Sequence, residues 1–405
     1  MVHRPVVVAA CAALLLASCG PSAGTGLAPS TTGCVAAPAS SPTTPSPSEA
    51  VSLGPVDFVD GERGWVVAAS GSGWRTLRTS DGGATWAALP LGDVAAVHEL
   101  RFADQCRGWL IAATPDRRLS LRTTSDGGAS WSERLTRRDR SSTGAALGLQ
   151  GLQVGDGDSA WIVADVERCD DRECPSELLA TIDGGTRWTA IHPARPRLLL
   201  PRFVDARHGW IVRSVAADGA FELAGTRDGG RTWSALALPP FVHDMAFVGV
   251  RDGWILGRDG SWCTASFCHR WYLYRTTDGG GSWTTLQGST ATSSAWWLPN
   301  PAASRAGFLG GVHFTDERHG WIGLGVGAGG AGQRVGGVIT TGDGGLTWEQ
   351  TGSEPFPKDV ARLSVVDARS AWAVSGLSTG GAGGELYRTT DGGRTWTRQL
   401  PDRLP

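Results

Sequence analysis

The sequence predicts an all-β protein, a seven-bladed β-propeller whose blades are four-stranded antiparallel sheets. Two short motifs that each recur seven times predict this fold, and the composition agrees with it. The chain of 405 residues contains 58 glycines and 19 tryptophans. Many glycines with regularly placed tryptophans are typical of short strands joined by tight turns, each blade carrying its own aromatic plug.

The first motif is a glycine or alanine followed by tryptophan, and its seven copies contain Trp65, Trp109, Trp161, Trp210, Trp254, Trp321 and Trp372. A Phe-x-Asp segment lies at a fixed offset before four copies, beginning at Phe58, Phe102, Phe203 and Phe314. Val154 and Val365 begin milder variants, and Phe247 begins a copy that has lost the aspartate. We expect the Phe-x-Asp segment to lie in the first strand of each blade and the tryptophan in the second.

The second motif is Thr-x-Asp-Gly-Gly-x-Thr/Ser-Trp. Its aspartates are Asp81, Asp126, Asp183, Asp228, Asp278, Asp343 and Asp391. They lie 45 residues apart (81 to 126) to 65 residues apart (278 to 343), the size of one four-stranded blade. The glycines predict a tight turn between strands three and four, capped by the carboxylate. Hydroxyls on either side can bond to the aspartate, except where Arg187 replaces one in the third copy.

These octads resemble Asp-boxes, the BNR repeat of sialidases, sortilin-type propellers and xyloglucan hydrolases. Seven copies combined with the Gly-Trp motif most resemble the photosystem II stability and assembly factor family, single seven-bladed propellers, over about residues 55–398. The resemblance implies help in assembling or stabilising a membrane protein complex. Because the box builds turns and carries no chemistry in these families, the seven aspartates are expected to be structural, with no cofactor and no metal.

The amino terminus predicts export from the cytoplasm. The apolar run Val6–Leu16 is too short to span a membrane but suits a signal peptide. It ends in Leu-Ala-Ser-Cys-Gly, which resembles the lipobox of bacterial lipoproteins and predicts lipidation of Cys19. The alternative is an ordinary secretory signal with an incidental cysteine. We therefore expect a signal peptide over 1–18, a Pro/Ser/Thr-rich tether over 19–50 and the propeller over 51–402.

Cysteine usage agrees with an oxidising compartment, since six cysteines remain after the signal peptide and the lipidated residue are set aside. Two pairs share a spacing of four intervening residues that a short-loop disulfide can close: Cys169 with Cys174, and Cys263 with Cys268. Cys34 and Cys106 would then pair by elimination. A zinc site is the rival interpretation, but only His269 lies beside these cysteines.

Charge and motifs argue against nucleic-acid binding and against catalysis. The formal net charge of −2 gives no support to a nucleic-acid partner. A sialidase would need an Arg-Ile-Pro signature, which is absent, and a tyrosine nucleophile, whereas Tyr274 and Tyr387 occupy core positions of strand three. His208 and His319 occupy a turn position rather than a metal site. We expect a monomeric, non-enzymatic binding protein without catalytic residues; the alternative is a glycan-binding or sialidase-like glycoside hydrolase propeller.

The expected partner is an envelope or membrane protein client, or a cell-surface glycan. In an up-and-down blade, the 2–3 loops and the blade-to-blade connections emerge opposite the Asp-boxes, and the least repetitive segments lie there. The candidate anchors are Trp296, Trp297, Trp262, Trp74, Arg137, Arg138 and Arg140, because exposed aromatics and arginines dominate binding energies. The arginines are expected in a blade-to-blade connection, Ser132–Gly151. The adjacent tryptophans could instead form a lid over the central channel.

Overall fold

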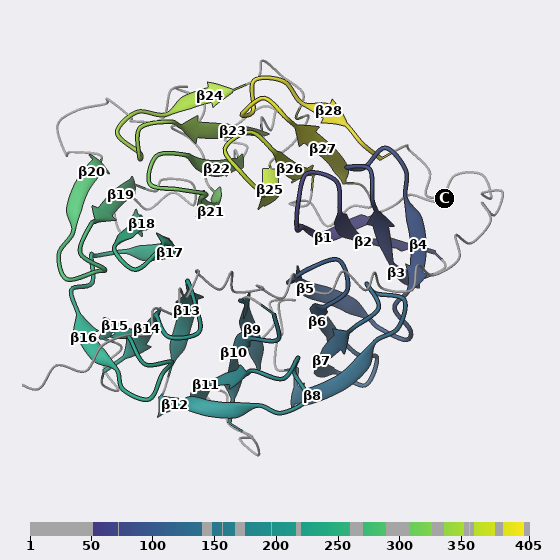
Figure 1. Cartoon of the computed structure of the whole chain (residues 1–405), viewed down its shortest axis with the longest axis horizontal. Helices are drawn as coiled ribbons and strands as arrows, with labels where there is room; N and C mark the ends of the chain where they lie inside the picture. Colours follow the sequence, from purple (N-terminus) through teal and green to yellow (C-terminus); the bar gives the residue numbers. More distant parts are fainter. Residues whose placement is uncertain are drawn as a thin grey trace, which may run out of the picture. The chain divides into compact units, whose positions relative to one another are not determined.

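Seven four-stranded antiparallel sheets surround one axis, each built from four consecutive strands (Figure 1), which confirms the predicted fold class. The structure is a computed structural model. It describes residues 52–71, 73–139, 148–155, 157–166, 175–195, 197–215, 220–259, 270–288, 308–325, 336–351, 356, 360–376 and 384–400, all within the unit Cys34–Pro405. None of these described stretches forms a helix long and apolar enough to cross a membrane.

The strands follow the chain blade by blade. Blades 1 to 4 consist of β1 (Ser52–Phe58), β2 (Gly64–Ser70), β3 (Gly73–Thr79), β4 (Ala87–Pro90); β5 (Ala96–Phe102), β6 (Gly108–Ala113), β7 (Arg118–Thr124), β8 (Ser132–Arg138); β9 (Leu149–Val154), β10 (Ala160–Asp165), β11 (Ser176–Thr181), β12 (Thr189–Arg195); and β13 (Leu198–Phe203), β14 (Gly209–Ser214), β15 (Phe221–Thr226), β16 (Ser234–Leu236). Blades 5 to 7 consist of β17 (Val242–Val248), β18 (Asp252–Asp259), β19 (Arg270–Thr276), β20 (Thr284–Gly288); β21 (Phe308–Phe314), β22 (Gly320–Gly325), β23 (Gly336–Thr341), β24 (Glu349–Thr351); and β25 (Val360–Val365), β26 (Ala371–Ser375), β27 (Glu385–Thr389), β28 (Thr397–Arg398).

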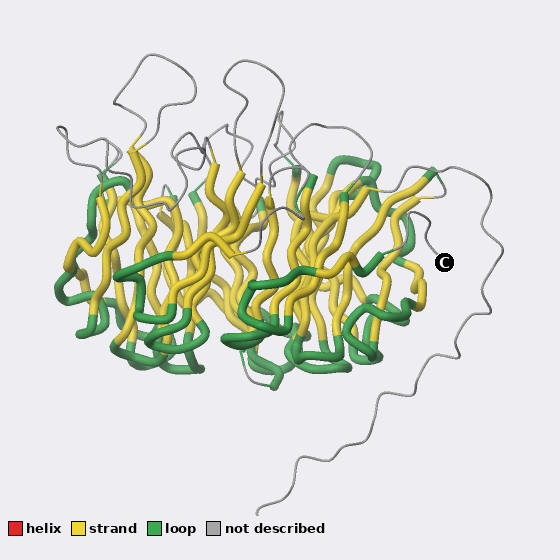
Figure 2. The backbone as a smooth tube through the Cα atoms, turned by 90° about the horizontal axis from the view of Figure 1, so that it is seen from above, coloured by secondary structure: helices red, strands yellow, loops and turns green. Residues whose placement is uncertain are grey.

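The repeated motifs occupy the predicted places in each blade. In blade 2 the innermost strand β5 ends at Phe102, β6 begins at Gly108, and the Asp-box joins β7 to β8. All seven innermost strands also contain a register shift against the second strand, such as the one between Val97 and Glu99. A bulge of this kind bends a strand and increases its twist. The described turns after strands one and three lie together on one face, shown in green in Figure 2.

The glycine before the strand-two tryptophan has a steric cause. Phe102 and Gly108 are cross-strand partners, and a Cβ at position 108 would lie 2.5 Å from the phenylalanine Cε1. The same close approach to a phenylalanine ring occurs at Gly64, Gly209, Gly253 and Gly320. In blades 3 and 7 a smaller valine faces an alanine: Val154 with Ala160, and Val365 with Ala371.

Aromatic rings join neighbouring blades. Between blades 1 and 2, Trp65 stacks on Phe102 with centroids 3.6 Å apart, and Trp131 meets Phe102 edge-on at 6.1 Å. The Trp65 Nε1–H donates to the Gly127 carbonyl in the Asp-box of blade 2. The stack recurs at four other junctions: Trp161–Phe203, Trp210–Phe247, Trp254–Phe314 and Trp372–Phe58. The strand-two tryptophans are thus the buried plugs, at most 4% exposed, whereas six of the seven box tryptophans are only half-buried.

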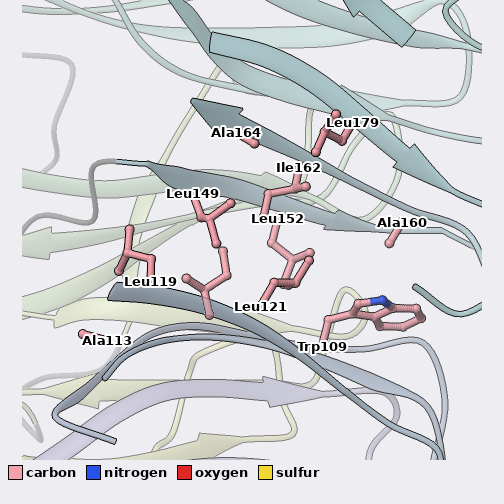
Figure 3. Close-up of a cluster of buried hydrophobic side chains, with 11 residues drawn as sticks. Trp109, Ala113, Leu119, Leu121, Leu149, Leu152, Ala160, Ile162, Ala164 and Leu179 are labelled. Carbon is pink, nitrogen blue, oxygen red and sulfur yellow. The ribbon is translucent and has the colours of Figure 1, made fainter. Parts of the chain in front are cut away.

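Aliphatic side chains complete each junction. Figure 3 shows the cluster between blades 2 and 3, where Leu119 and Leu121 of β7 approach Leu149 and Leu152 of β9. All four leucines are at most 1% exposed. Burying such side chains contributes about 1.5–3 kcal/mol each. The core of this protein is therefore a ring of separate clusters between blades rather than one central core.

The last blade joins the first through the same contacts. Blade 7 consists of β25 to β28, so within the described residues no strand is exchanged between the two ends of the propeller. Phe58 of β1 stacks on Trp372 of β26 at 3.6 Å, and the Trp372 Nε1–H donates to the Gly82 carbonyl at 3.2 Å. The ring therefore closes by side-chain packing.

Each Asp-box is a turn whose aspartate accepts hydrogen bonds from residues of the same turn, as predicted. In blade 2, Asp126 accepts from the Thr124 hydroxyl at 2.7 Å and from the Ser130 hydroxyl at 2.6 Å, while Gly127 and Gly128 have positive φ angles of 72° and 92°. In blade 5 the equivalent hydroxyls hold the pKa of Asp278 at about 2. In the third box only the backbone N–H of Arg187 remains on that side, so one hydroxyl bond is missing there.

Candidate functional site

A ring of side chains lines the central channel near the face that carries the Asp-boxes. Each is the residue immediately before the Phe-x-Asp position: Asp57, Arg101, Gln153, Arg202, Ala246, His313 and Ser364. All seven line one cavity of about 290 Å³. Because side chains alternate along a strand, the phenylalanine packs between blades while its predecessor faces the channel.

Asp57 and Arg101 form one side of this ring. The Asp57 Oδ2 accepts the backbone N–H of Phe102 at 2.7 Å and thereby links blade 1 to blade 2. Its Oδ1 lies 3.9 Å from the Arg101 Nη1, a loose ion pair. Burial raises the pKa of Asp57 to about 6, although Arg101 and the Phe102 N–H act in the opposite direction. Asp57 is therefore mostly ionised at neutral pH and mostly protonated near pH 5.

Arg202 and His313 form another part of the ring, beside Asp244, which lies three positions before Phe247. The Arg202 guanidinium donates to Asp244 at 2.5 Å and to the Met245 carbonyl at 2.7 Å, and Asp244 accepts the Val312 N–H at 3.0 Å. These bonds join blades 4, 5 and 6. Burial is the main cause that lowers the pKa of His313 to about 4. The charges of Arg101 and Arg202 also lower this pKa, whereas the charge of Asp244 raises it. The imidazole is therefore neutral at physiological pH.

A second layer of charged residues lies three positions before the phenylalanine. The Glu99 carboxylate accepts the N–H groups of Gly151 and Leu152 at 2.8 and 2.9 Å, which ties blade 2 to blade 3. Arg362 of blade 7 reaches the His98 carbonyl of blade 2 at 3.4 Å. Burial lowers the pKa of both His98 and Arg362. Glu99 thus satisfies two backbone donors of the adjoining blade, whereas Arg362 reaches a backbone acceptor two blades away.

The arrangement suits polar recognition. The carboxylate oxygens of Asp244 and Glu99 accept hydrogen bonds from neighbouring blades. The Arg101 guanidinium donates one hydrogen bond, to the Leu100 carbonyl, and 41% of its side chain is exposed. A half-exposed guanidinium beside a half-buried carboxylate can pair with charged or amide groups of a peptide. Among the described residues no three His, Cys, Asp or Glu side chains are placed to hold a metal ion.

Two of the sequence-predicted anchors have structural roles. Trp74 is half-buried in β3 and its Nε1–H donates to the Ala95 carbonyl at 3.0 Å. The Arg137 side chain is 11% exposed and its Nε–H donates to the Asp165 carbonyl of blade 3 at 2.8 Å. Arg138 is exposed at the end of β8.

The expected position of the arginines was wrong in part. Residues 132–138 form the outermost strand of blade 2 rather than a blade-to-blade connection. The strand forms because β7 offers an unpaired edge, and six cross-strand pairs from Arg118↔Arg138 to Thr123↔Ser132 fill it.

The remaining candidates lie outside the described residues. These are the lipidation site Cys19, the anchors Trp262, Trp296, Trp297 and Arg140, and the cysteines Cys34, Cys169, Cys174, Cys263 and Cys268. Cys106 is disulfide-bonded, and its pairing with Cys34 stays a prediction. His208 and His319 bond to Asp205 and Asp316 of their own turns, as their turn position indicates.

Sequence reasoning missed the channel ring. The signal is present, because the residue before each Phe-x-Asp copy is polar in six of seven blades and charged or histidine in four. Period-two alternation applied to that strand would have turned these residues away from the aromatic packing.

The fold and the channel together define a seven-bladed propeller with a polar, ligand-sized central cavity. No protein-family model matches the chain, and no curated protein matches it in sequence.

Solved structures match in fold. YCF48 bound to D1 peptide matches with a TM-score of 0.50 and 17% identity, over 84% of this chain and 92% of that one. The propeller domain of the Trilobed protease from Pyrococcus furiosus, described as having an open velcro topology, matches with 0.56 and 9%, over 87% and 96%. An ancestral GH74 enzyme matches with 0.50 and 10%, over 85% of this chain but 44% of that one. At these identities the likeness concerns the fold, which binding proteins and enzymes share.

Proposed function

We propose that this chain is a lipid-anchored protein of the bacterial envelope whose propeller binds a protein client and assists the assembly or stability of a membrane-associated complex. The lipobox-like segment ending at Cys19 supports the anchor and the extracytoplasmic location. The repeat resemblance and the fold match to YCF48, which was solved with a D1 peptide, support a protein client.

The observation that carries the proposal is the state of the channel ring. Arg101 is half-exposed and only loosely paired, while Asp57 beside it is held by a backbone bond of the neighbouring blade. Because Asp57 is fixed in this way, it loses little freedom when a partner binds. A client segment that carries a charged side chain can therefore dock at the channel mouth. The loop anchors Trp296, Trp297, Trp262 and Arg140, together with the exposed Arg138, would add contacts on the opposite face.

Affinity capture from envelope extracts, with matched baits, tests this function. We expect the wild-type chain and Arg231→Gln, which changes an exposed arginine of a box turn, to capture the same client. Arg101→Gln should weaken capture at least fivefold if the channel mouth binds. Replacing Trp296 and Trp297 with serine should weaken it if the loop face binds. Equal capture by all four stably folded baits would contradict both placements of the site.

The anchor is tested separately by fractionation. Cys19→Ala removes the acyl chains and should release the protein from membranes, because those chains supply one of its two sources of membrane affinity. A mutant that stays membrane-bound without detergent would contradict the lipidation site.

A glycoside hydrolase is the second candidate function, because the raised pKa of Asp57 is a property of general acids. Such an enzyme also needs a second free carboxylate, and Asp244 and Glu99 in the channel are bound to neighbouring groups. We propose that the chain has no such activity. Chromogenic aryl glycosides and sialosides should give no turnover, and turnover that disappears in Asp57→Asn would overturn this part of the proposal.

A further inference from the structure

A groove lies between blades 6 and 7 on the face that carries the Asp-boxes. Its volume is about 490 Å³. Its walls include Trp321 and Thr340 of blade 6, Glu349 of the same blade, and Arg369 and Asp391 of blade 7. The repeat explains why the chain leaves this junction open.

The first reason is the loss of an aromatic stack. Five junctions fill this space with a phenylalanine from the following blade, but blade 7 has Val365 at that position. Trp321 therefore has no phenylalanine stacked on it and instead meets Trp396 edge-on, with centroids 6.4 Å apart.

The second reason is the loss of an arginine. In blades 1, 5 and 7 an arginine faces the strand-two tryptophan across the sheet, as Arg275 faces Trp254 at 5.2 Å. Its guanidinium also covers the box glycine of the next blade, since a Cβ on Gly344 would lie 2.5 Å from the Arg275 Nη1. Blade 6 has Thr340 at this position, opposite Trp321.

The junction of blades 2 and 3 lacks the same phenylalanine and arginine but is bridged by an ion pair. Arg107 of blade 2 pairs with Asp158 of blade 3 at 2.7 Å. Within blade 2, the Arg134 Nε–H also donates to the hydroxyl of Thr123, the residue opposite Trp109, at 2.9 Å. At the open junction, His319 stands in the motif where blade 2 has Arg107, and Arg369 stands where blade 3 has Asp158. Since both are basic they cannot form this pair, and His319 bonds to Asp316 of its own turn.

The open groove offers unused polar groups. The side chains of Glu349 and Arg369 are exposed, and neither has a hydrogen bond or ion pair within the described part of the chain. The lining contains groups of both charges, Glu349 on one side and Arg369 and Arg394 on the other, whereas the Asp343 and Asp391 carboxylates are bonded within their own Asp-boxes. A simple anion would meet the carboxylates and a simple cation the guanidiniums. A neutral ligand that carries many hydroxyls can both donate to and accept from this lining.

We propose that this groove binds a short oligosaccharide. The groove has the volume of a ligand site, 300–1,000 Å³ being typical. A saccharide would bind there through the exposed Glu349 and Arg369, because Trp321 at the base of the groove is only 1% exposed. The site lies away from the channel ring, and the proposal does not depend on client binding.

Filling the groove with the residue of the other blades tests the proposal. Thr340→Arg restores the arginine found in blades 1, 5 and 7, so it should fold normally while closing the site. Calorimetric titration of the full-length chain in detergent with chitotriose and with maltotriose should show binding of at least one of them. We expect Thr340→Arg to weaken that binding at least tenfold, and the matched change Arg275→Thr in blade 5 to leave it within twofold.

A second pair of variants keeps the test valid if Thr340→Arg does not fold. Glu349→Gln and Arg369→Ala change exposed side chains and should each weaken saccharide binding three- to tenfold with an unchanged melting temperature. Absence of binding by both saccharides would overturn the proposal, as would equal binding by folded groove variants. If the wild-type chain binds neither saccharide and the groove variants reduce client capture, the proposal would be overturned and the groove would instead bind a peptide.

Discussion

Replacing Gly108 with alanine should destabilise the protein by about 1 kcal/mol. The new methyl carbon would lie 2.5 Å from Cε1 and 2.6 Å from Cδ1 of Phe102, far inside ordinary contact. The ring cannot retreat, because Trp65 stacks on one face at 3.6 Å and Trp131 closes its edge. Overpacking of this kind costs about 1–3 kcal/mol, from which a gain of about 0.5–1 kcal/mol for alanine over glycine in a strand is subtracted.

The change Phe102→Val should relieve the clash, because it recreates the Val154–Ala160 pair of blade 3. On its own it should cost about 2–3 kcal/mol through the lost stack and the cavity. The double variant should lose at least about 1 kcal/mol less stability than the sum of the losses in the two single variants. Urea denaturation followed by fluorescence and circular dichroism gives the four free energies, with equal m-values as the control.

Strictly additive costs would refute the steric explanation, as would an unchanged midpoint in Gly108→Ala. Ala160→Gly in blade 3 provides the contrast, because only a valine faces it across the strands. That change should cost about 1 kcal/mol from backbone freedom and one lost methyl group, and Phe102→Val should not alter its cost.

Four further outcomes are expected. The pKa of His313 is about 4 in the folded protein and 6.5 in the unfolded chain. The free energy of unfolding should therefore decrease as pH falls from 6.5 toward 4, because the unfolded chain binds the proton first. His313→Gln should reduce this decrease, measured by urea denaturation at several pH values. Asp57 acts oppositely, since its raised pKa favours the fold as pH falls below 6, and Asp57→Asn should steepen the decline. Arg187→Thr should raise the thermal midpoint by restoring a hydroxyl bond, whereas Thr232→Arg should lower it in blade 4. Trp254→Ala should cost about 3–5 kcal/mol in denaturation experiments, more than the same change at a half-buried box tryptophan.

The blade architecture could be predicted because it is encoded locally. A strand, a turn that needs positive φ and a capping carboxylate lie within eight residues of each Asp-box, so seven copies determine seven hairpins. The pairing of Phe102 with Gly108, and of Val154 with Ala160, is also visible in the sequence. It becomes interpretable only with the hairpin register, which places the two positions directly opposite each other.

The candidate site was less predictable, since it depends on contacts between blades. Trp74 and Arg137 are partly buried because each donates a hydrogen bond to a carbonyl of another segment, Ala95 and Asp165. No local sequence pattern encodes these contacts. The groove beside Trp321 likewise arises from three separate replacements in two blades. Each replacement alone resembles ordinary variation of the repeat.

The closure of the ring has a consequence for how the molecule can be rearranged. Since Phe58 meets Trp372 as Phe102 meets Trp65, the boundary between the first and last blades is interchangeable with the boundary between blades 1 and 2. A circular permutant that links β28 to β1 and begins at β9 would place its ends at a different boundary without dividing any sheet. Each blade is therefore a module that duplication could add or remove as a unit.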